Sequence, residues 1–127
     1  MSRPPAKELT ERELEVMQYF WRQGDATIAE VRDGLAAEGL DRAYTTVATL
    51  VRILTEKGFL EQLTTERPFS FRPVRSRDEV AGRLLEDLVD RVFQGSREEL
   101  LLRLFDDRRL TRQERARLAK ILKEQGQ

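Results

Sequence analysis

The chain has 127 residues, with 23 basic and 23 acidic side chains and therefore no formal net charge. Its hydrophobic content of 39% and charged content of 36% are typical of a folded protein with a highly charged surface. The sequence contains no cysteine and no histidine, which excludes disulfides, thiolate or imidazole zinc sites and a histidine general base. We therefore expect no catalytic residue, no metal and no cofactor, and we predict that the protein is not an enzyme.

The sequence also lacks the features of a membrane protein. No apolar stretch approaches the roughly 20 residues that a membrane-spanning helix needs. The N-terminal residues MSRPPAKELT have no apolar core of the kind found in signal peptides. We therefore expect a cytoplasmic protein that does not insert into a membrane.

Five positions carry the signature of a helix start, a hydroxyl residue followed three positions later by glutamate. In this capping box, the two side chains satisfy backbone amides that the first helical turn leaves unpaired. Each pair precedes apolar residues that repeat with a helical period. The pairs are Thr10/Glu13, Thr27/Glu30, Ser76/Glu79, Ser96/Glu99 and Thr111/Glu114.

Residues 11 to 58 predict three short amphipathic helices, over 11–23, 28–38 and 44–57. Gly24, Gly39 and Gly58 end them, and Asp41 is expected to be the N-cap of the third. Asp25 to Thr27 is expected to be a brief extended link. The residues expected on the buried faces are Leu14, Met17, Phe20 and Trp21 in the first helix, Ile28, Val31 and Leu35 in the second, and Val47, Leu50, Val51 and Leu54 in the third.

A β-hairpin is predicted after the third helix. Its strands run from Phe59 to Thr64 and from Phe69 to Arg72, and a short turn joins them. Pro68 and Pro73 bracket the second strand and are expected to restrict it to a sheet edge. Three helices followed by a hairpin predict a winged helix-turn-helix over residues 8–73.

The polar face of the third helix indicates nucleic-acid binding. Thr45, Thr49 and Arg52 point away from its apolar face. Hydroxyls could simply fill a solvent-facing surface, but β-branched threonine is a middling helix former. Small side chains leave room for base edges and the thymine methyl group. We therefore predict that this helix lies in a DNA groove.

Positive charge is concentrated where the DNA is expected. Residues 1–73 hold ten basic and twelve acidic side chains, but residues 42–73 hold five basic and three acidic ones. This balance favours specific binding with weak nonspecific affinity. The arginines could also be ordinary surface residues, and Tyr44 could be a packing residue or a backbone hydrogen-bonder. The predicted DNA-binding set is Thr27, Arg42, Tyr44, Thr45, Thr46, Thr49, Arg52, Arg67 and Arg72.

From Ser76 onward the sequence predicts only helices, over 77–93, 97–105 and 112–124. Three short helices in about 50 residues cannot easily close a core. We therefore predict a dimerisation domain over residues 76–124, with an intrachain core as the alternative. A dimer also suits two-fold DNA sites. The predicted interface residues are Val80, Leu84, Leu85, Leu88, Val92, Leu101, Leu104, Phe105, Leu118, Ile121 and Leu122.

The ordered set of these segments resembles the penicillinase repressor family of winged-helix regulators (BlaI/MecI type). The matching segments are LTERELEVMQYFW, TIAEVRDGL, YTTVATLVRILTEKGFL, a hairpin ending in FRP, FQGSREELLLRLF and LTRQERARLAKIL. The resemblance implies a homodimeric transcriptional repressor whose third helix enters the major groove of a two-fold operator. It also implies that Thr45, Thr46 and Thr49 read bases and that Arg67 is the wing arginine.

The sequence departs from the family pattern at several positions. Glu66 stands where the wing turn often has glycine, and Ile53 stands where many relatives have arginine. Phe69 and Phe71 replace two common tyrosines. In the β-lactam-responsive branch, a membrane sensor leads to cleavage of the repressor, and the usual asparagine at the cleavage site corresponds to Leu104 here. The copper-responsive branch uses cysteines that this chain lacks, so the releasing signal and any regulatory protease or sensor are unknown.

The sequence thus predicts a mainly α protein with a small β-hairpin wing. Its predicted function is that of a homodimeric repressor that binds double-stranded operator DNA. A winged domain used only for protein contact within a larger assembly is the alternative. A regulator that binds a small molecule in a pocket between its domains is a second alternative.

Overall fold

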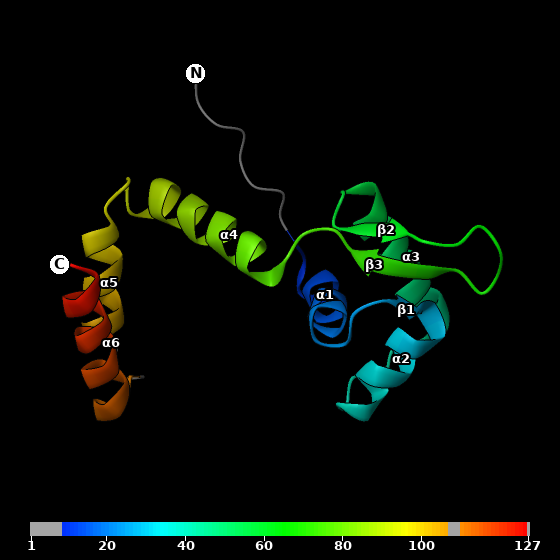
Figure 1. Ribbon diagram of the computed structural model, residues 1–127, viewed down its shortest axis with the longest axis horizontal. Coiled ribbons are helices and arrows are strands. Elements are labelled where there is room, and N and C mark those ends of the chain that lie inside the picture. The colour runs from blue at the N-terminus through cyan, green and yellow to red at the C-terminus, as the bar shows by residue number, and fades with distance from the viewer. Residues whose placement is uncertain (1–8, 107–109, 127) are drawn as a thin grey trace, which may run out of the picture. The chain divides into compact units, whose positions relative to one another are not determined.

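A computed structural model describes residues 9–106 and 110–126 of the chain. The predicted fold class is confirmed, because the described residues form a mainly helical structure with a small antiparallel sheet (Figure 1). The elements, in chain order, are α1 (Glu11–Gln23), β1 (Ala26–Thr27), α2 (Ile28–Ala37), α3 (Tyr44–Glu56), β2 (Leu60–Gln62), β3 (Ser70–Pro73), α4 (Arg77–Val92), α5 (Arg97–Asp106) and α6 (Arg112–Gln125).

The chain divides into two compact units between Leu84 and Leu85. The first, here called the winged unit, contains α1 to α3, the sheet and the first half of α4. The second contains the rest of α4 with α5 and α6. The first unit thus includes residues beyond the expected domain end at 73, while the separate roles expected for 8–73 and 76–124 stay predictions.

The predicted capping boxes begin the helices. At α1, Glu13 N donates to Thr10 Oγ1 at 3.1 Å, and Thr10 N donates to Glu13 Oε1 at 2.8 Å. The same reciprocal bonds begin α2 at Thr27/Glu30 and α6 at Thr111/Glu114. At α4 and α5 the hydroxyl of Ser76 or Ser96 accepts from the amide three residues later. Local hydrogen bonding therefore fixes where these helices start.

The start of α3 differs from the prediction. Its N-cap is Ala43, which has no side chain that can cap the helix, so the assignment of Asp41 was wrong. Val47 N donates to Ala43 O at 3.1 Å, which closes the first turn through the backbone alone. Gly58, with a φ of 86°, follows the C-cap residue Lys57, as predicted for the helix end.

The sheet contains one strand more than the predicted hairpin. β1 pairs with β3, and β3 pairs with β2, so β3 is central and its assignment to a sheet edge was wrong. β1 pairs only with Ser70 and Phe71, so the missing amide of Pro73 interrupts no bond on that side. Pro73 instead pairs with Leu60 of β2 at the strand's other end. The two residues of β1 are too few to show a strand pattern in the sequence.

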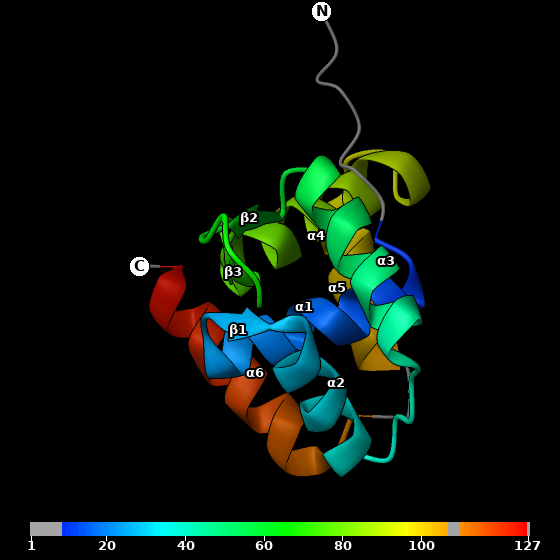
Figure 2. The same ribbon diagram turned by 90° about the vertical axis from the view of Figure 1, so that its right-hand side faces the viewer.

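The core of the winged unit lies where α1, α2 and α3 pack together and against the sheet (Figure 2). Most predicted inward residues belong to it, whereas Leu14, Trp21, Ile28 and Leu50 are half-buried. Val16 and the carboxylate residue Glu13 of α1 are also buried, although neither was among the residues predicted to be buried. The buried hydrophobic members of the core are Val16, Met17, Phe20, Ala26, Val31, Leu35, Val47, Val51, Leu54, Phe59, Leu60, Phe71 and Val80.

The second unit buries little of its apolar surface. Val89 is buried, but many large apolar side chains are exposed. The exposed apolar residues of this unit are Leu85, Leu88, Val92, Leu102, Leu104, Ile121 and Leu122.

In the described parts of the chain, no helix combines the length and apolarity that crossing a membrane requires.

Candidate nucleic-acid interface

The two faces of α3 differ completely in exposure. Val47, Val51 and Leu54 are each 0% exposed and hold the helix against the core. Thr45, Thr49 and Arg52 are exposed on the opposite face, as predicted, and Thr46 is half-buried at its margin. The helix therefore presents short hydroxyl side chains to solvent from a fixed support.

A groove borders this face between α3, the start of α2 and the wing, which is the segment of residues 63–69 between β2 and β3. The wing projects as a loop beyond the two strands (Figure 1). The groove has a volume of about 530 Å³ and brings together three predicted residues, Thr27, Tyr44 and Arg67. The other lining residues are small or apolar and do not belong to the predicted DNA-binding set: Ile28, Ala29, Ala48, Pro68 and Phe69.

Tyr44 and Arg67 are held by cation–π contacts beside this groove. The guanidinium of Arg32 lies 5.7 Å from the ring centroid of Tyr44. The guanidinium of Arg67 lies 5.4 Å from the ring centroid of Phe69. Arg67 is exposed and makes no ion pair with any residue that the structure describes. Its charge is thus available to an anion on this side of the wing.

The other predicted phosphate-binding arginines are paired with carboxylates. Arg52 Nη1 lies 3.0 Å from Glu56 Oε1 on the same helix, and both side chains are exposed. Arg72 Nη2 lies 3.2 Å from Glu61 Oε2, which is opposite it on β2. These exposed pairs are weak in water, so a phosphate can replace the carboxylate at little cost.

Arg42 lies in a tighter arrangement. Its Nη2 donates to both carboxylate oxygens of Glu15, at 3.0 and 3.2 Å, and its Nε donates to Oε2 at 3.3 Å. The hydrogen bonds that Arg42 donates to Glu15 raise the pKa of Arg42 above its ordinary value. Both side chains are half-buried, so this guanidinium already has a partner in the fold.

Lys57, at the other end of α3, also binds a carboxylate of α1. Its Nζ donates to Glu13 Oε1 at 2.9 Å and to Oε2 at 3.1 Å. The sequence predicts only a capping role for Glu13 and no partner for Glu15 or Lys57. A signal for the Glu13–Lys57 pair is nevertheless present in the sequence, since an acidic residue at an inward position of an amphipathic helix requires a buried cation or donor.

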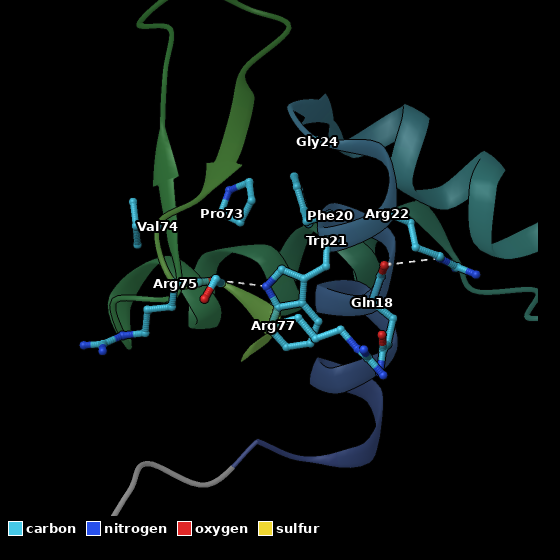
Figure 3. Close-up of a pocket in the computed structure, with 10 residues that line it drawn as sticks. Gln18, Phe20, Trp21, Arg22, Gly24, Pro73, Val74, Arg75 and Arg77 are labelled. Atoms are coloured by element: carbon cyan, nitrogen blue, oxygen red, sulfur yellow. Dashed lines mark hydrogen bonds between the residues drawn. The ribbon is translucent and has the colours of Figure 1, made fainter. Parts of the chain in front are cut away.

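A second hollow, of about 720 Å³, lies elsewhere on the winged unit, between the end of α1 and the start of α4 (Figure 3). The indole of Trp21 lies at its centre, and Trp21 Nε1 donates to Arg75 O at 2.9 Å. Two of its arginines have partners inside the unit: Arg22 pairs with Glu38, and Arg75 contacts Gly58 O, Glu79 and the Phe59 ring. These contacts hold the chain between β3 and α4.

The predicted interface residues of α4 to α6 differ in exposure. Val80 is buried in the core of the winged unit. Leu101, Phe105 and Leu118 are half-buried. The exposed members of the predicted interface are Leu84, Leu85, Leu88, Val92, Leu104, Ile121 and Leu122.

In the described residues there is no group of three or more metal-ligating side chains.

Comparison with known proteins gives a consistent result. The penicillinase repressor family matches residues 9–124 of this chain. The transcriptional regulator BlaI from two strains of Mycobacterium tuberculosis (CDC 1551 / Oshkosh and ATCC 25618 / H37Rv) is 35% identical over 96 residues, covering 74% of this chain and 69% of the relative. The solution structure of the DNA binding domain of the repressor BlaI is 25% identical with a TM-score of 0.50, and the match covers 62% of this chain and 93% of that domain.

Proposed function

Because the chain belongs to the penicillinase repressor family of transcriptional regulators, we propose that it acts as a homodimer that blocks transcription by occupying two-fold operator DNA. Each winged unit places α3 in a major groove and the wing against the flanking backbone. The named relatives are a transcriptional regulator and the DNA binding domain of a repressor, which supports this assignment. We place the protein in the cytoplasm, where its operator is.

The observation that carries this proposal is the division of α3 into a fully buried face and a threonine face. A helix that enters the major groove needs short side chains on its outer face, since base edges lie within reach only when the backbone comes close. Thr45 and Thr49 meet this requirement because both are exposed. Thr46 lies at the margin of the face and contacts the DNA from there. These three threonines are proposed to read the bases.

Contacts to phosphate supply most of the affinity in this proposal. Arg67 binds the backbone directly, because its guanidinium is exposed and has no carboxylate within the described residues. Arg52 and Arg72 exchange their carboxylate partners for phosphate. Thr27 and Tyr44 contact the backbone from the groove beside the wing. Arg42 approaches the DNA while its guanidinium stays on Glu15.

The exposed apolar residues of the second unit support dimerisation. A monomeric protein rarely leaves so many large apolar side chains in water without a partner surface. A second copy that covers Leu85, Leu88 and Val92 removes them from solvent. Two linked winged units then bind both halves of a two-fold site. Once one unit is bound, the effective concentration of the other at its half-site is higher, which increases the overall affinity.

Selection of DNA fragments from the protein's own genome tests this proposal. The full chain is immobilised, and retained fragments are sequenced. The matched control is the Thr45→Glu/Thr49→Glu variant, which keeps the arginines but brings two carboxylates to the groove. We expect the wild-type protein to enrich a few promoter fragments that contain an inverted repeat. Equal retention by both proteins, or no enrichment, would contradict the proposal and favour a winged unit that contacts only protein.

A further inference from the structure

The buried carboxylate of Glu13 lies at an ion pair that joins α1 to the C-terminal end of α3. Glu13 is 3% exposed, although it belongs to the first turn of α1. Oε1 accepts from Thr10 N at 2.8 Å and from Lys57 Nζ at 2.9 Å, and Oε2 accepts from Lys57 Nζ at 3.1 Å. One carboxylate therefore caps α1 and binds the C-cap residue of α3.

A second ion pair joins α1 to the opposite end of α3. Glu15 is two residues along α1 from Glu13, and its carboxylate accepts three hydrogen bonds from Arg42. Arg42 directly precedes Ala43, the N-cap residue of α3, which has no side-chain cap. The two carboxylates of α1 thus bind the residues that flank α3 on both sides.

Stability alone does not account for this pair, in which the Glu13 carboxylate is buried and the Lys57 side chain is 30% exposed. Removing the carboxylate and part of the ammonium from water is costly, and well-packed apolar residues often stabilise a protein as well or better in their place. Burial alone would raise the pKa of Glu13, but hydrogen bonds from Lys57 and from Thr10, with the charge of Lys57, lower it. Glu13 is therefore ionised in the fold, and its bonds have direction as well as strength.

Direction matters because the burial of apolar side chains has no preferred direction of its own, whereas hydrogen-bonded ion pairs do. Val47, Val51 and Leu54 attach α3 to the core through such apolar burial. Base recognition tolerates little displacement, since productive geometry is held to within about 0.5 Å and 10–20°. A helix held at both ends by directional bonds keeps its outer face in one orientation.

We propose that the Glu13–Lys57 ion pair, together with the Glu15–Arg42 pair, fixes the axial position of α3 and so determines selectivity for operator over other DNA. This inference rests on the proposed function of α3 as the groove-binding helix. Glu13 and Lys57 are positioning residues, because they act through the threonine face and touch no base. In this proposal the Glu13–Lys57 pair selects one arrangement of the fold rather than strengthening it.

The Glu13→Leu/Lys57→Met variant tests the proposal with the full chain. It removes one acid and one base, so the net charge and the electrostatic attraction to DNA are unchanged. The matched control is Arg22→Met/Glu38→Leu, which removes an exposed pair between α1 and the end of α2. Lys57→Arg is the conservative variant. If the double variant fails to fold, Glu13→Gln is used, because it keeps the shape and the capping bond to Thr10.

Two measurements are made well below the melting temperature. The first is hydrogen exchange of the hydrogen-bonded amides of α3 in the DNA-free protein, which we expect to become about tenfold faster while those of α2 are unchanged. The second is the ratio of the dissociation constants for random and operator DNA, which we expect to fall about tenfold because the lost affinity belongs to base contacts. Lys57→Arg and the control pair should leave both measurements near wild type.

The outcomes separate this inference from the proposed function. Unchanged exchange in α3, or faster exchange with an unchanged affinity ratio, overturns the positioning role. A loss of affinity that is equal for operator and random DNA also overturns it, since a merely destabilised protein loses both alike. If the wild-type protein itself does not discriminate operator DNA, the proposed function fails, and hydrogen exchange still shows whether the ion pairs hold α3.

Discussion

Thr49 occupies the middle of the exposed face of α3, directly opposite the buried side chains. Replacing it with glutamate adds a carboxylate where base edges and phosphates are expected, so operator affinity should fall by about 1–3 kcal/mol, or roughly 5- to 150-fold. Fluorescence anisotropy with labelled operator measures the change. The melting temperature should stay near wild type because the side chain packs against nothing buried. Normal operator binding by this variant would show that another face reads the DNA.

Glu13 gives the stability of the protein a predictable dependence on pH. The pKa of its carboxyl lies below the ordinary value of 4.5, because bonds from Lys57 and Thr10 outweigh the effect of burial. A lowered pKa in the folded state contributes stability that is complete above pH 4.5 and is lost as the pH falls through the folded-state pKa. The difference in free energy of unfolding between wild type and Glu13→Gln should therefore shrink below pH 4.5.

Denaturant unfolding at a series of pH values measures this difference. Lys57→Met is the informative control, because burial without the ammonium raises the pKa of Glu13 and should weaken or reverse the loss of stability in acid. A difference between wild type and Glu13→Gln that is constant down to the acid transition would show that the carboxylate is not stabilised by its partners.

The crossing of α1 and α2 depends on a close approach at Gly34. A Cβ at this position would overlap with Cε2 of the Tyr19 ring, closer than packed atoms can come. Gly34→Ala should lower the free energy of unfolding, since overpacking costs about 1–3 kcal/mol. In a Tyr19→Ala background the same change should raise it by about 0.5–1 kcal/mol, because alanine favours a helix interior more than glycine does.

Thermal unfolding of the four proteins in this cycle gives the coupling between the two positions. A destabilising effect of Gly34→Ala that is equal in both backgrounds would show that backbone conformation, rather than the aromatic ring of α1, requires glycine in α2.

Among the elements, those with local signals were predicted well. Each predicted capping box lies within four residues. Both of its hydrogen bonds are present at the starts of α1, α2 and α6, and the bond to the serine hydroxyl is present at α4 and α5. The exposed threonine face followed from the period of α3 alone. β1 was missed because two residues carry no strand pattern, and its pairing with β3 depends on residues more than 40 positions away. The same dependence made β3 a central strand despite its flanking prolines.

Assembly of two copies is expected to depend on the exposed apolar side chains of α4. Leu88 is 42% exposed on α4, and an arginine there would place a charge in the proposed interface. Leu88→Arg should sediment as a monomer and bind operator weakly, because each winged unit then binds without the linked second unit. Arg83→Ala, an exposed polar change on the other side of α4, should leave the mass unchanged. An unchanged dimer mass for Leu88→Arg would place the interface elsewhere.

The sequence alone is enough to predict the starts of the five helices with a hydroxyl cap, the apolar and polar faces of α3 and the absence of cysteine and histidine chemistry. These properties depend on composition or on residues within one or two helical turns, so local physics decides them. The burial of Glu13 against Lys57, 44 residues away, and the binding of Arg42 to Glu15, 27 residues away, follow instead from the way the helices pack. Which carboxylate meets which cation depends on how the helices cross, because many charged residues compete and nothing in their spacing selects the partners.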